Sequence, residues 1–176
     1  MNTAMRRKLT HGHAFVALGT NLPSDLGSPE DTLRRSMAAL IPLSQHLPVI
    51  SGIYESEPKD CPPDSPSYLN AVVAILPLPD ETPLSLLHKL QHIENRYGRV
   101  RTGQVNEART LDLDLLAFGS EQCATPELIL PHPRAHERRF VLWPWIEIAG
   151  DAWPLAGRTL AQWLMDCQDP PLSLLE

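Results

Sequence analysis

Apolar patterning in the first half of the chain predicts three strands. The run at 13–19 (HAFVALG) is apolar and ends in glycine, which is typical of a buried strand. Residues with a β preference also fill 48–57 (PVISGIYESE) and 68–78 (YLNAVVAILPL), which predicts a second and a third strand. Between them, the stretch 59–67 (KDCPPDSPS) contains three prolines and is therefore expected to be a loop.

Two stretches show the period of an amphipathic helix. The first, 28–43, opens with Ser28 as a candidate N-cap, and Pro29 follows at the first helical position. The second, 82–98, places apolar residues on one face and ends at Gly98, a residue type that commonly terminates helices. Both segments are therefore expected to pack one face against the sheet.

A fourth predicted strand, 109–119 (RTLDLDLLAFG), has one apolar and one acidic face. Leucines at positions 111, 113 and 115 alternate with Asp112 and Asp114, so the two carboxylates point the same way. Two neighbouring like charges repel each other and require positive partners. The partners could be basic side chains in a structural ion-pair network, or Mg²⁺ held by the carboxylates and substrate phosphates.

The resulting order of elements, β-α-β-β-α-β, is that of a ferredoxin-like αβ sandwich. We therefore predict an α+β fold with an antiparallel sheet and a C-terminal helical extension. In the extension, Trp143 and Trp145 are expected to pack the C-terminal segment onto the core. The predicted organisation is a loose leader at 1–12, a single domain at 13–170 and a C-terminal tail at 171–176.

Arginines flank the acidic strand on both sides. Arg99, Arg101 and Arg109 come before or at its start, and Arg134, Arg138 and Arg139 follow it. In such a cluster the carboxylates can hold a metal ion, and each guanidinium group can bind two phosphate oxygens at once. This pattern favours Mg-nucleotide binding over a simple neutralising network. The sequence has no G-x-x-x-x-G-K-[ST] motif, which excludes a P-loop as the phosphate site.

Composition narrows the class of protein further. The formal net charge of −6 argues against a protein that coats nucleic acid or an anionic membrane. No apolar run is long enough to span a bilayer. The three cysteines form no C-x-x-C pair, so neither a disulfide framework nor a zinc site is indicated. We expect a cytoplasmic protein, and a monomer because no long apolar helix face is left unassigned.

Five segments carry a resemblance to a known family. They are ALGTNL, YLNAVV, GRVR, RTLDLDLLAFG and LPHPRAHERRFVLWPWIEIA, in this order along the chain. Their order and spacing resemble those of the 6-hydroxymethyl-7,8-dihydropterin pyrophosphokinase family over about residues 13 to 165. The blocks RTLDLD and PHPRAHERRF are highly specific when they occur together.

The resemblance implies a reaction of folate biosynthesis. Pyrophosphate would pass from ATP to the hydroxymethyl group of a reduced pterin, with release of AMP. ATP would be the co-substrate, and two Mg²⁺ ions would bridge Asp112, Asp114, the ATP phosphates and the pterin hydroxyl. The acidic face of the fourth strand would then be the floor of a metal-dependent phosphoryl-transfer site.

The resemblance also implies three groups of site residues. The catalytic group is Arg99, Arg109, Asp112 and Asp114, with both aspartates as metal ligands. The ATP-binding group is Gln91, Glu94, Arg101, Leu115, Leu128, His132 and Arg138. The pterin-binding group is Ser56, Tyr68, Asn70 and Phe140. Of these, His132 is expected to donate hydrogen bonds rather than to act as a base, and the two aromatic rings are expected to sandwich the pterin.

Two loops depart from the family pattern. Asn106 stands where a tryptophan is frequent and Glu107 adds a negative charge, while Lys59 replaces an apolar residue near the expected pterin site. The altered loops leave open a paralogue with a different hydroxylated acceptor. We expect the loop 98–108 to be the most mobile internal segment, because Gly98 and a second glycine would permit a large movement.

Two further alternatives belong to other classes of protein. A non-catalytic module that binds Mg-ATP or pterin predicts the loss of an aspartate or of Arg109, and both aspartates and this arginine are present. A metal-dependent phosphodiesterase or nuclease could also use the D-x-D pair. The acidic net charge and the lack of further acidic or histidine ligands nearby in the sequence weigh against it.

Overall fold

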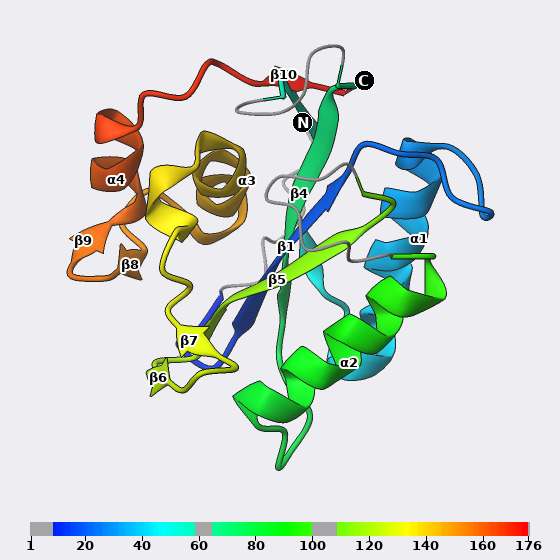
Figure 1. The fold of residues 1–176 in the computed structure, drawn as a ribbon. Coiled ribbons are helices and arrows are strands. Elements are labelled where there is room, and N and C mark those ends of the chain that lie inside the picture. Colours follow the sequence, from blue (N-terminus) through cyan, green and yellow to red (C-terminus); the bar gives the residue numbers. More distant parts are fainter. Residues whose placement is uncertain (1–8, 59–64, 100–108, 176) are drawn as a thin grey trace, which may run out of the picture.

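The structure, a computed structural model, describes residues 9–58, 65–99 and 109–175. Its centre is an antiparallel sheet in the order β10-β3-β4-β1-β5, and β2 also pairs with β4. The strands are β1 (Ala14–Thr20), β2 (Val49–Ile50), β3 (Tyr54–Ser56), β4 (Tyr68–Ile75), β5 (Asp112–Phe118) and β10 (Ser173–Leu174). This order confirms the predicted α+β, ferredoxin-like arrangement, as Figure 1 shows.

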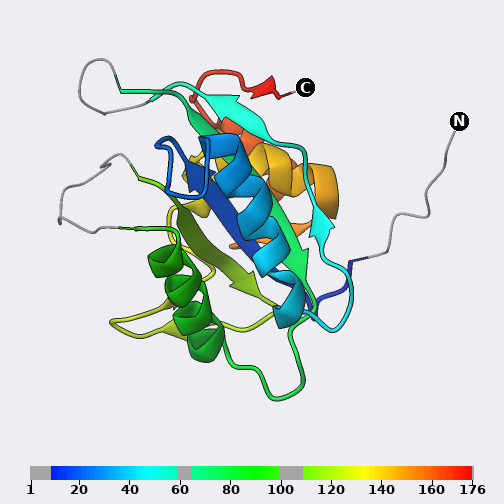
Figure 2. The ribbon, with the colours of Figure 1, turned by 90° about the vertical axis from the view of Figure 1, so that its right-hand side faces the viewer.

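Helices cover both faces of the sheet. The pair α1 (Pro29–Ala39) and α2 (Pro83–Arg96) lies on one face, and α3 (Arg139–Ala149) and α4 (Leu160–Asp166) lie on the other (Figures 1 and 2). Strand residues alternate between two cores accordingly. Val16 belongs to the core that includes side chains of α1 and α2, whereas Phe15 belongs to the core that includes Trp145 of α3. The acidic pair of β5 therefore faces the layer of α3.

Short elements complete the described chain. They are the 3₁₀ helices η1 (Ile41–Leu43) and η2 (Ala135–Glu137), and the two small hairpins of β6 (Cys123–Ala124) with β7 (Ile129–Leu130) and of β8 (Pro154–Leu155) with β9 (Arg158–Thr159). Among the described residues, none of the helices has the length and apolar character that crossing a bilayer requires.

The predicted helix signals act as expected. The Ser28 side chain accepts a hydrogen bond from the Asp31 N–H at 3.1 Å, and Asp31 bonds back to the Ser28 N–H in a capping box. Thr82 caps α2 through the Ser85 N–H at 3.2 Å. Gly98 follows α2 with φ of +76°, a conformation that side chains disfavour. These local signals explain why both helices begin where the sequence predicts and why α2 ends next to Gly98.

The predicted second strand is interrupted, and this differs from the sequence expectation of one strand over 48–57. The Ser51 Oγ accepts the Val72 N–H at 2.9 Å, and the Gly52 N–H donates to Glu147 Oε2 of α3 at 2.9 Å. Backbone groups that turn toward side chains cannot continue the ladder, so β2 and β3 are separate. The first predicted helix likewise ends at Ala39, and η1 completes the segment.

The C-terminal extension contains a helix with an internal proline. Trp145 is fully buried and its ring lies 5.1 Å from that of Phe15, which confirms its predicted packing role. Trp143 is 46% exposed, so the same prediction is wrong for this residue. The two side chains are separated by two positions of α3, about 200° around the helix, and therefore point in opposite directions. The division of the chain at residues 12 and 170 stays a prediction, and β10 lies within the segment expected as a tail.

Candidate active site

The acidic face of β5 lies opposite small residues of β1. In the pairing of the two strands, Asp112 is opposite Gly19 and Asp114 is opposite Ala17. Small side chains beside the carboxylates leave space above the sheet on this face. A pocket occupies that space, and both Gly19 and Ala17 line it together with the aspartates. We call it the aspartate pocket.

The aspartate pocket brings together most of the expected catalytic and pterin-binding residues and one expected ATP-binding residue, Arg138. Those that line it are Ser56, Tyr68, Asn70, Arg109, Asp112, Asp114, Arg138 and Phe140. They come from β3, β4, β5, the segment before β5, and the start of α3, which are distant in sequence. The structure therefore gathers the predicted residues at one place, while their functional roles stay predictions.

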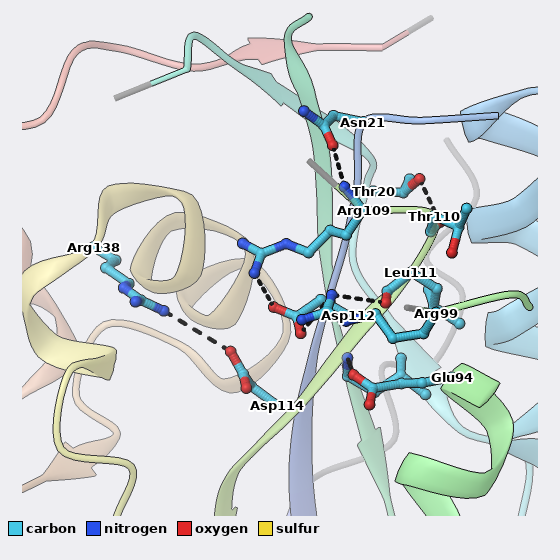
Figure 3. Close-up of polar contacts among 11 residues, drawn as sticks. Thr20, Asn21, Glu94, Arg99, Arg109, Thr110, Leu111, Asp112, Asp114 and Arg138 are labelled. Carbon is cyan, nitrogen blue, oxygen red and sulfur yellow. Dashed lines mark hydrogen bonds and ion pairs between the residues drawn. The ribbon is translucent and has the colours of Figure 1, made fainter. Parts of the chain in front are cut away.

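The two carboxylates have different partners, as the close-up in Figure 3 shows. Asp112 forms ion pairs with both Arg99, at 3.2 Å, and Arg109, at 3.0 Å. The Arg99 side chain is only 6% exposed and also donates to the Leu111 carbonyl at 3.0 Å. Asp114 has a longer contact of 3.8 Å with Arg138. Protein cations thus neutralise Asp112 better than Asp114.

This asymmetry leaves Asp114 short of positive charge. Partial burial at the pocket floor, where the Asp114 side chain is 36% exposed, raises the pKa of Asp114, and the negative charge of Asp112 raises it further. His132, Arg138 and Arg109 act in the opposite direction without cancelling the effect. A carboxylate that is desolvated and incompletely paired is stabilised by an added cation. The donor set of two adjacent carboxylates therefore fits a Mg²⁺ ion that takes its other ligands from phosphates and water.

His132 is held at the edge of the site by two backbone contacts. Its N–H donates to the Leu116 carbonyl of β5 at 2.8 Å, and its Nδ1 accepts the Arg134 N–H at 3.2 Å. Burial lowers the pKa of His132, with Asp114 opposing that shift. A neutral ring whose Nδ1 accepts a hydrogen bond carries its proton on Nε2. His132 can therefore donate from Nε2, but it does not line the aspartate pocket, and its role as a donor to ATP stays a prediction.

Two buried polar residues at the end of β1 hold the entrance to β5. The Arg109 N–H donates to Asn21 Oδ1 at 2.9 Å, and the Asn21 N–H donates back to the Arg109 carbonyl at 3.1 Å. Thr20 Oγ1 donates to the Thr110 carbonyl at 2.7 Å. Neither residue was expected at the site from the sequence. The sequence signal that could have found them is a pair of uncharged polar residues at the end of an apolar strand. In the structure, Thr20 and Asn21 are 0% and 3% exposed.

The aromatic residues expected at the pterin site lie close to the arginines. The Arg109 guanidinium lies over the Tyr68 ring at 5.5 Å, and the Arg138 guanidinium lies over the Phe140 ring at 5.6 Å. The Asn70 amide nitrogen donates to Ser56 Oγ at 2.9 Å. Asn70 is opposite Gly19 of β1, which is itself opposite Asp112. The three residues lie side by side on neighbouring strands, so the expected pterin-binding residues adjoin the aspartates.

Several residues expected to bind ATP lie away from the pocket lining. Leu115 and Leu128 are buried in the core on the side of α1 and α2, 2% and 8% exposed. Glu94 is also buried, and its Oε1 accepts the Leu113 N–H of edge strand β5 at 2.8 Å. Gln91, on α2, is half-buried. An ATP-binding role for these four residues stays a prediction.

Some expectations lie outside the described residues. Arg101, Lys59, Asn106 and Glu107 belong to this group, as does nearly all of the loop 98–108 that we expect to be mobile. Among the described residues, the two aspartates have no third histidine, cysteine or acidic residue grouped with them. Glu57, Glu137 and Asp169 also line the pocket, but among the described residues they form no metal-ligating group with the two aspartates.

Comparison with known proteins gives a consistent result. A profile of the family described as 7,8-dihydro-6-hydroxymethylpterin-pyrophosphokinase matches residues 15–150. The chain is 43% identical over 139 residues to the 2-amino-4-hydroxy-6-hydroxymethyldihydropteridine pyrophosphokinase of Haemophilus influenzae, covering 78% of this chain and 82% of the relative. The same-named protein of Bacillus subtilis is 41% identical, with 77% of each chain covered.

A solved structure supports the fold at much lower sequence identity. Wild-type HPPK-DHPS of Plasmodium falciparum matches with a TM-score of 0.59 and 13% identity, over 87% of this chain and 44% of that chain. At this identity the likeness shows the fold alone.

Proposed function

The chain belongs to the 7,8-dihydro-6-hydroxymethylpterin-pyrophosphokinase family, and on that premise we propose which of its residues bind the metal, ATP and the pterin. The protein transfers pyrophosphate from ATP to the hydroxymethyl group of 6-hydroxymethyl-7,8-dihydropterin, which yields AMP and the pterin diphosphate in folate biosynthesis. The observation that supports our assignment of residues is the aspartate pocket. The carboxylates of Asp112 and Asp114, the guanidinium groups of Arg109 and Arg138, and the rings of Tyr68 and Phe140 all line this one cavity.

Asp112 and Asp114 are assigned to Mg²⁺, and we propose two ions as the family resemblance implies. When bound, Mg²⁺ would neutralise triphosphate charge and polarise the reacting oxygens. The raised pKa of Asp114, caused by burial and by Asp112, supports this assignment because it marks a missing positive charge.

Arg109 and Arg138 are assigned to the phosphate oxygens of ATP. Each guanidinium lines the pocket and reaches a carboxylate at its floor. Within the described part of the chain, Arg109 Nε is buried and lacks a hydrogen-bond acceptor, so a donor is available for a ligand oxygen. Arg99 is assigned to positioning Asp112, since it contacts that carboxylate and the Leu111 carbonyl. Fixed positive groups of this kind stabilise charge that develops in the transition state.

Tyr68, Asn70, Ser56 and Phe140 are assigned to the pterin. The aromatic rings would pack against the faces of the bicyclic ring. The Asn70 nitrogen donates to Ser56 and to backbone carbonyls, so its carbonyl oxygen is the group we assign to the donors of the pterin edge. Burial of this amide, 4% exposed, would keep it in one orientation.

We further propose that the enzyme works as a monomer in the cytoplasm. The large exposed apolar side chains are spread over different elements, for example Leu47, Ile129 and Met165, rather than gathered on one strand or helix. Cys123 and Cys167 are free thiols, which suits a reducing compartment.

A product analysis tests the function directly. Purified protein incubated with ATP, Mg²⁺ and 6-hydroxymethyl-7,8-dihydropterin is expected to form AMP and the pterin diphosphate. Separation of the nucleotides by chromatography measures the AMP. Omission of the pterin, or chelation of the metal with EDTA, is expected to prevent AMP formation. AMP formed at the same rate without pterin would instead indicate a hydrolase.

His132 allows a test of the ATP half of the site. The variant His132→Asn keeps an acceptor near Nδ1 but loses the Nε2 donor, so the KM for ATP is expected to rise about tenfold. The variant His132→Gln is the matched control, since its amide nitrogen can replace Nε2. Steady-state kinetics with ATP varied at saturating pterin measures the effect. Equal KM values for the two variants would contradict the donor role.

A further inference from the structure

We propose that the C-terminal strap, residues 167–175, completes the pterin half of the aspartate pocket, an inference that rests on the proposed function. The strap runs from the end of α4 across the α3 layer to the edge of the sheet (Figure 1). Residues 169–172 line the same pocket as Asp112 and Asp114. They therefore form part of the wall that a bound substrate meets.

Arg139 fixes the start of the strap. Its Nε donates to the Asp169 carbonyl at 2.8 Å, its Nη2 donates to the Cys167 carbonyl at 3.0 Å, and its backbone N–H donates to Asp169 Oδ2 at 3.0 Å. The planar guanidinium thus holds two carbonyls at once. Because Phe140 is the next residue, the anchor also ties the strap to the aromatic side chain assigned to the pterin.

The far end of the strap joins the sheet. Strand β10 pairs with β3, and the Leu175 N–H donates to the Ile53 carbonyl at 2.8 Å. Leu174 lies directly over Gly52, where a Cβ would come within 2.6 Å of its Cδ1. Glycine at this position permits the close approach. Residues 169–172 are therefore held between two anchors rather than at a free end.

The position of the strap identifies which substrate it meets. In the sheet, β10 and β3 lie at one edge and β5 lies at the other. Of the pocket residues assigned to the pterin, Ser56 is on β3, the strand that pairs with β10, and Tyr68 is opposite Ser56. Phe140 follows Arg139, which holds the strap at Asp169. Arg99 lies beside Asp112 of β5, toward the opposite edge. The strap thus borders the pterin half and not the side of Arg99.

The chemistry of the strap suits a flat heterocycle. Pro170 and Pro171 are consecutive and exposed, and Leu172 follows them on the pocket wall. Proline has a fixed φ and no N–H. The pair therefore presents a stiff apolar surface without a backbone N–H that would require a hydrogen-bond acceptor. A bicyclic pterin ring that packs against this surface would bury apolar area on both partners.

The test replaces the stiff pair by glycine. In the double variant Pro170→Gly/Pro171→Gly, the KM for the pterin is expected to rise about tenfold, because the wall loses apolar contact and must be ordered on binding. The KM for ATP and kcat are expected to stay within about twofold of the unchanged protein. Pro154→Gly, at an exposed position of β8 that does not line the pocket, is the control for a proline-to-glycine change.

A second variant addresses the anchor. Arg139→Lys keeps the charge but cannot hold both carbonyls, so it is expected to raise the pterin KM with the ATP KM unchanged. Direct titration with 6-hydroxymethylpterin in the absence of ATP gives an independent Kd for each variant. An unchanged pterin Kd in the double glycine variant, in a protein that forms AMP normally, would overturn the strap proposal alone. No AMP from the unchanged protein would overturn the proposed function.

Discussion

Replacement of Asp114 by asparagine is expected to abolish pyrophosphoryl transfer and to make the protein more stable. The loss of turnover should be at least about a thousandfold, because the variant removes one of two carboxylates that hold the metal against the phosphates. The free energy of unfolding at neutral pH should rise, on the order of 0.5 kcal/mol, because the repulsion from Asp112 is relieved. A residue that destabilises the free protein is expected where function requires an incompletely paired charge.

The pH dependence of this effect follows from the direction of the pKa shift. The pKa of Asp114 is raised above its ordinary value of 3.8, first by burial and then by Asp112. The folded state therefore binds a proton more tightly than the unfolded state does. The stability that this group contributes is complete below pH 3.8 and is lost as the pH rises through the raised pKa. The advantage of Asp114→Asn should accordingly be small at low pH and larger at neutral pH.

Urea unfolding of the two proteins, without Mg²⁺ and at several pH values, measures this difference. Intrinsic fluorescence of the four tryptophans, of which Trp145 is fully buried, reports unfolding. Addition of Mg²⁺ with an unreactive ATP analogue should stabilise the unchanged protein more than the variant. Asp114→Asn that is less stable than the unchanged protein at neutral pH would contradict the pKa argument and favour a structural ion pair.

Replacement of Asp112 by asparagine is expected to abolish turnover equally but to destabilise the fold. Asp112 pairs with Arg99 and Arg109, and the Arg99 side chain is only 6% exposed. Removal of the carboxylate leaves two guanidinium groups close together without their common anion. The free energy of unfolding should fall by about 2–3 kcal/mol, less than for a fully buried pair because Arg109 remains partly exposed.

The two asparagine variants are matched controls for each other. Both remove one negative charge from β5 and keep the side-chain shape, so a general effect of charge on the strand would change their stability in the same direction. Opposite changes in the urea midpoint, with AMP formation lost in both, are the expected result. Equal stability in the two variants would show that Arg99 and Arg109 do not depend on Asp112 for neutralisation.

The amino-acid sequence by itself determined the order of elements and the acidic strand. Alternation of leucine and aspartate over 109–119 predicts both the buried face of β5 and the shared face of its carboxylates, because strand geometry has a period of two. Helix caps at Ser28 and Thr82 are equally local. The five segments that carry the resemblance led to the family, and the comparisons bear this out.

Which carboxylate is neutralised, and which residues line the pocket, became clear only from the tertiary structure. The sequence treats Asp112 and Asp114 alike, and only the positions of Arg99, Arg109 and Arg138 distinguish them. The small residues of β1 opposite the aspartates became recognisable only through the strand register. The strap lies about 30 positions from Arg139 and reaches the pocket through long-range hydrogen bonds. Contacts of this kind depend on how separate elements pack, and no local pattern of residues encodes them.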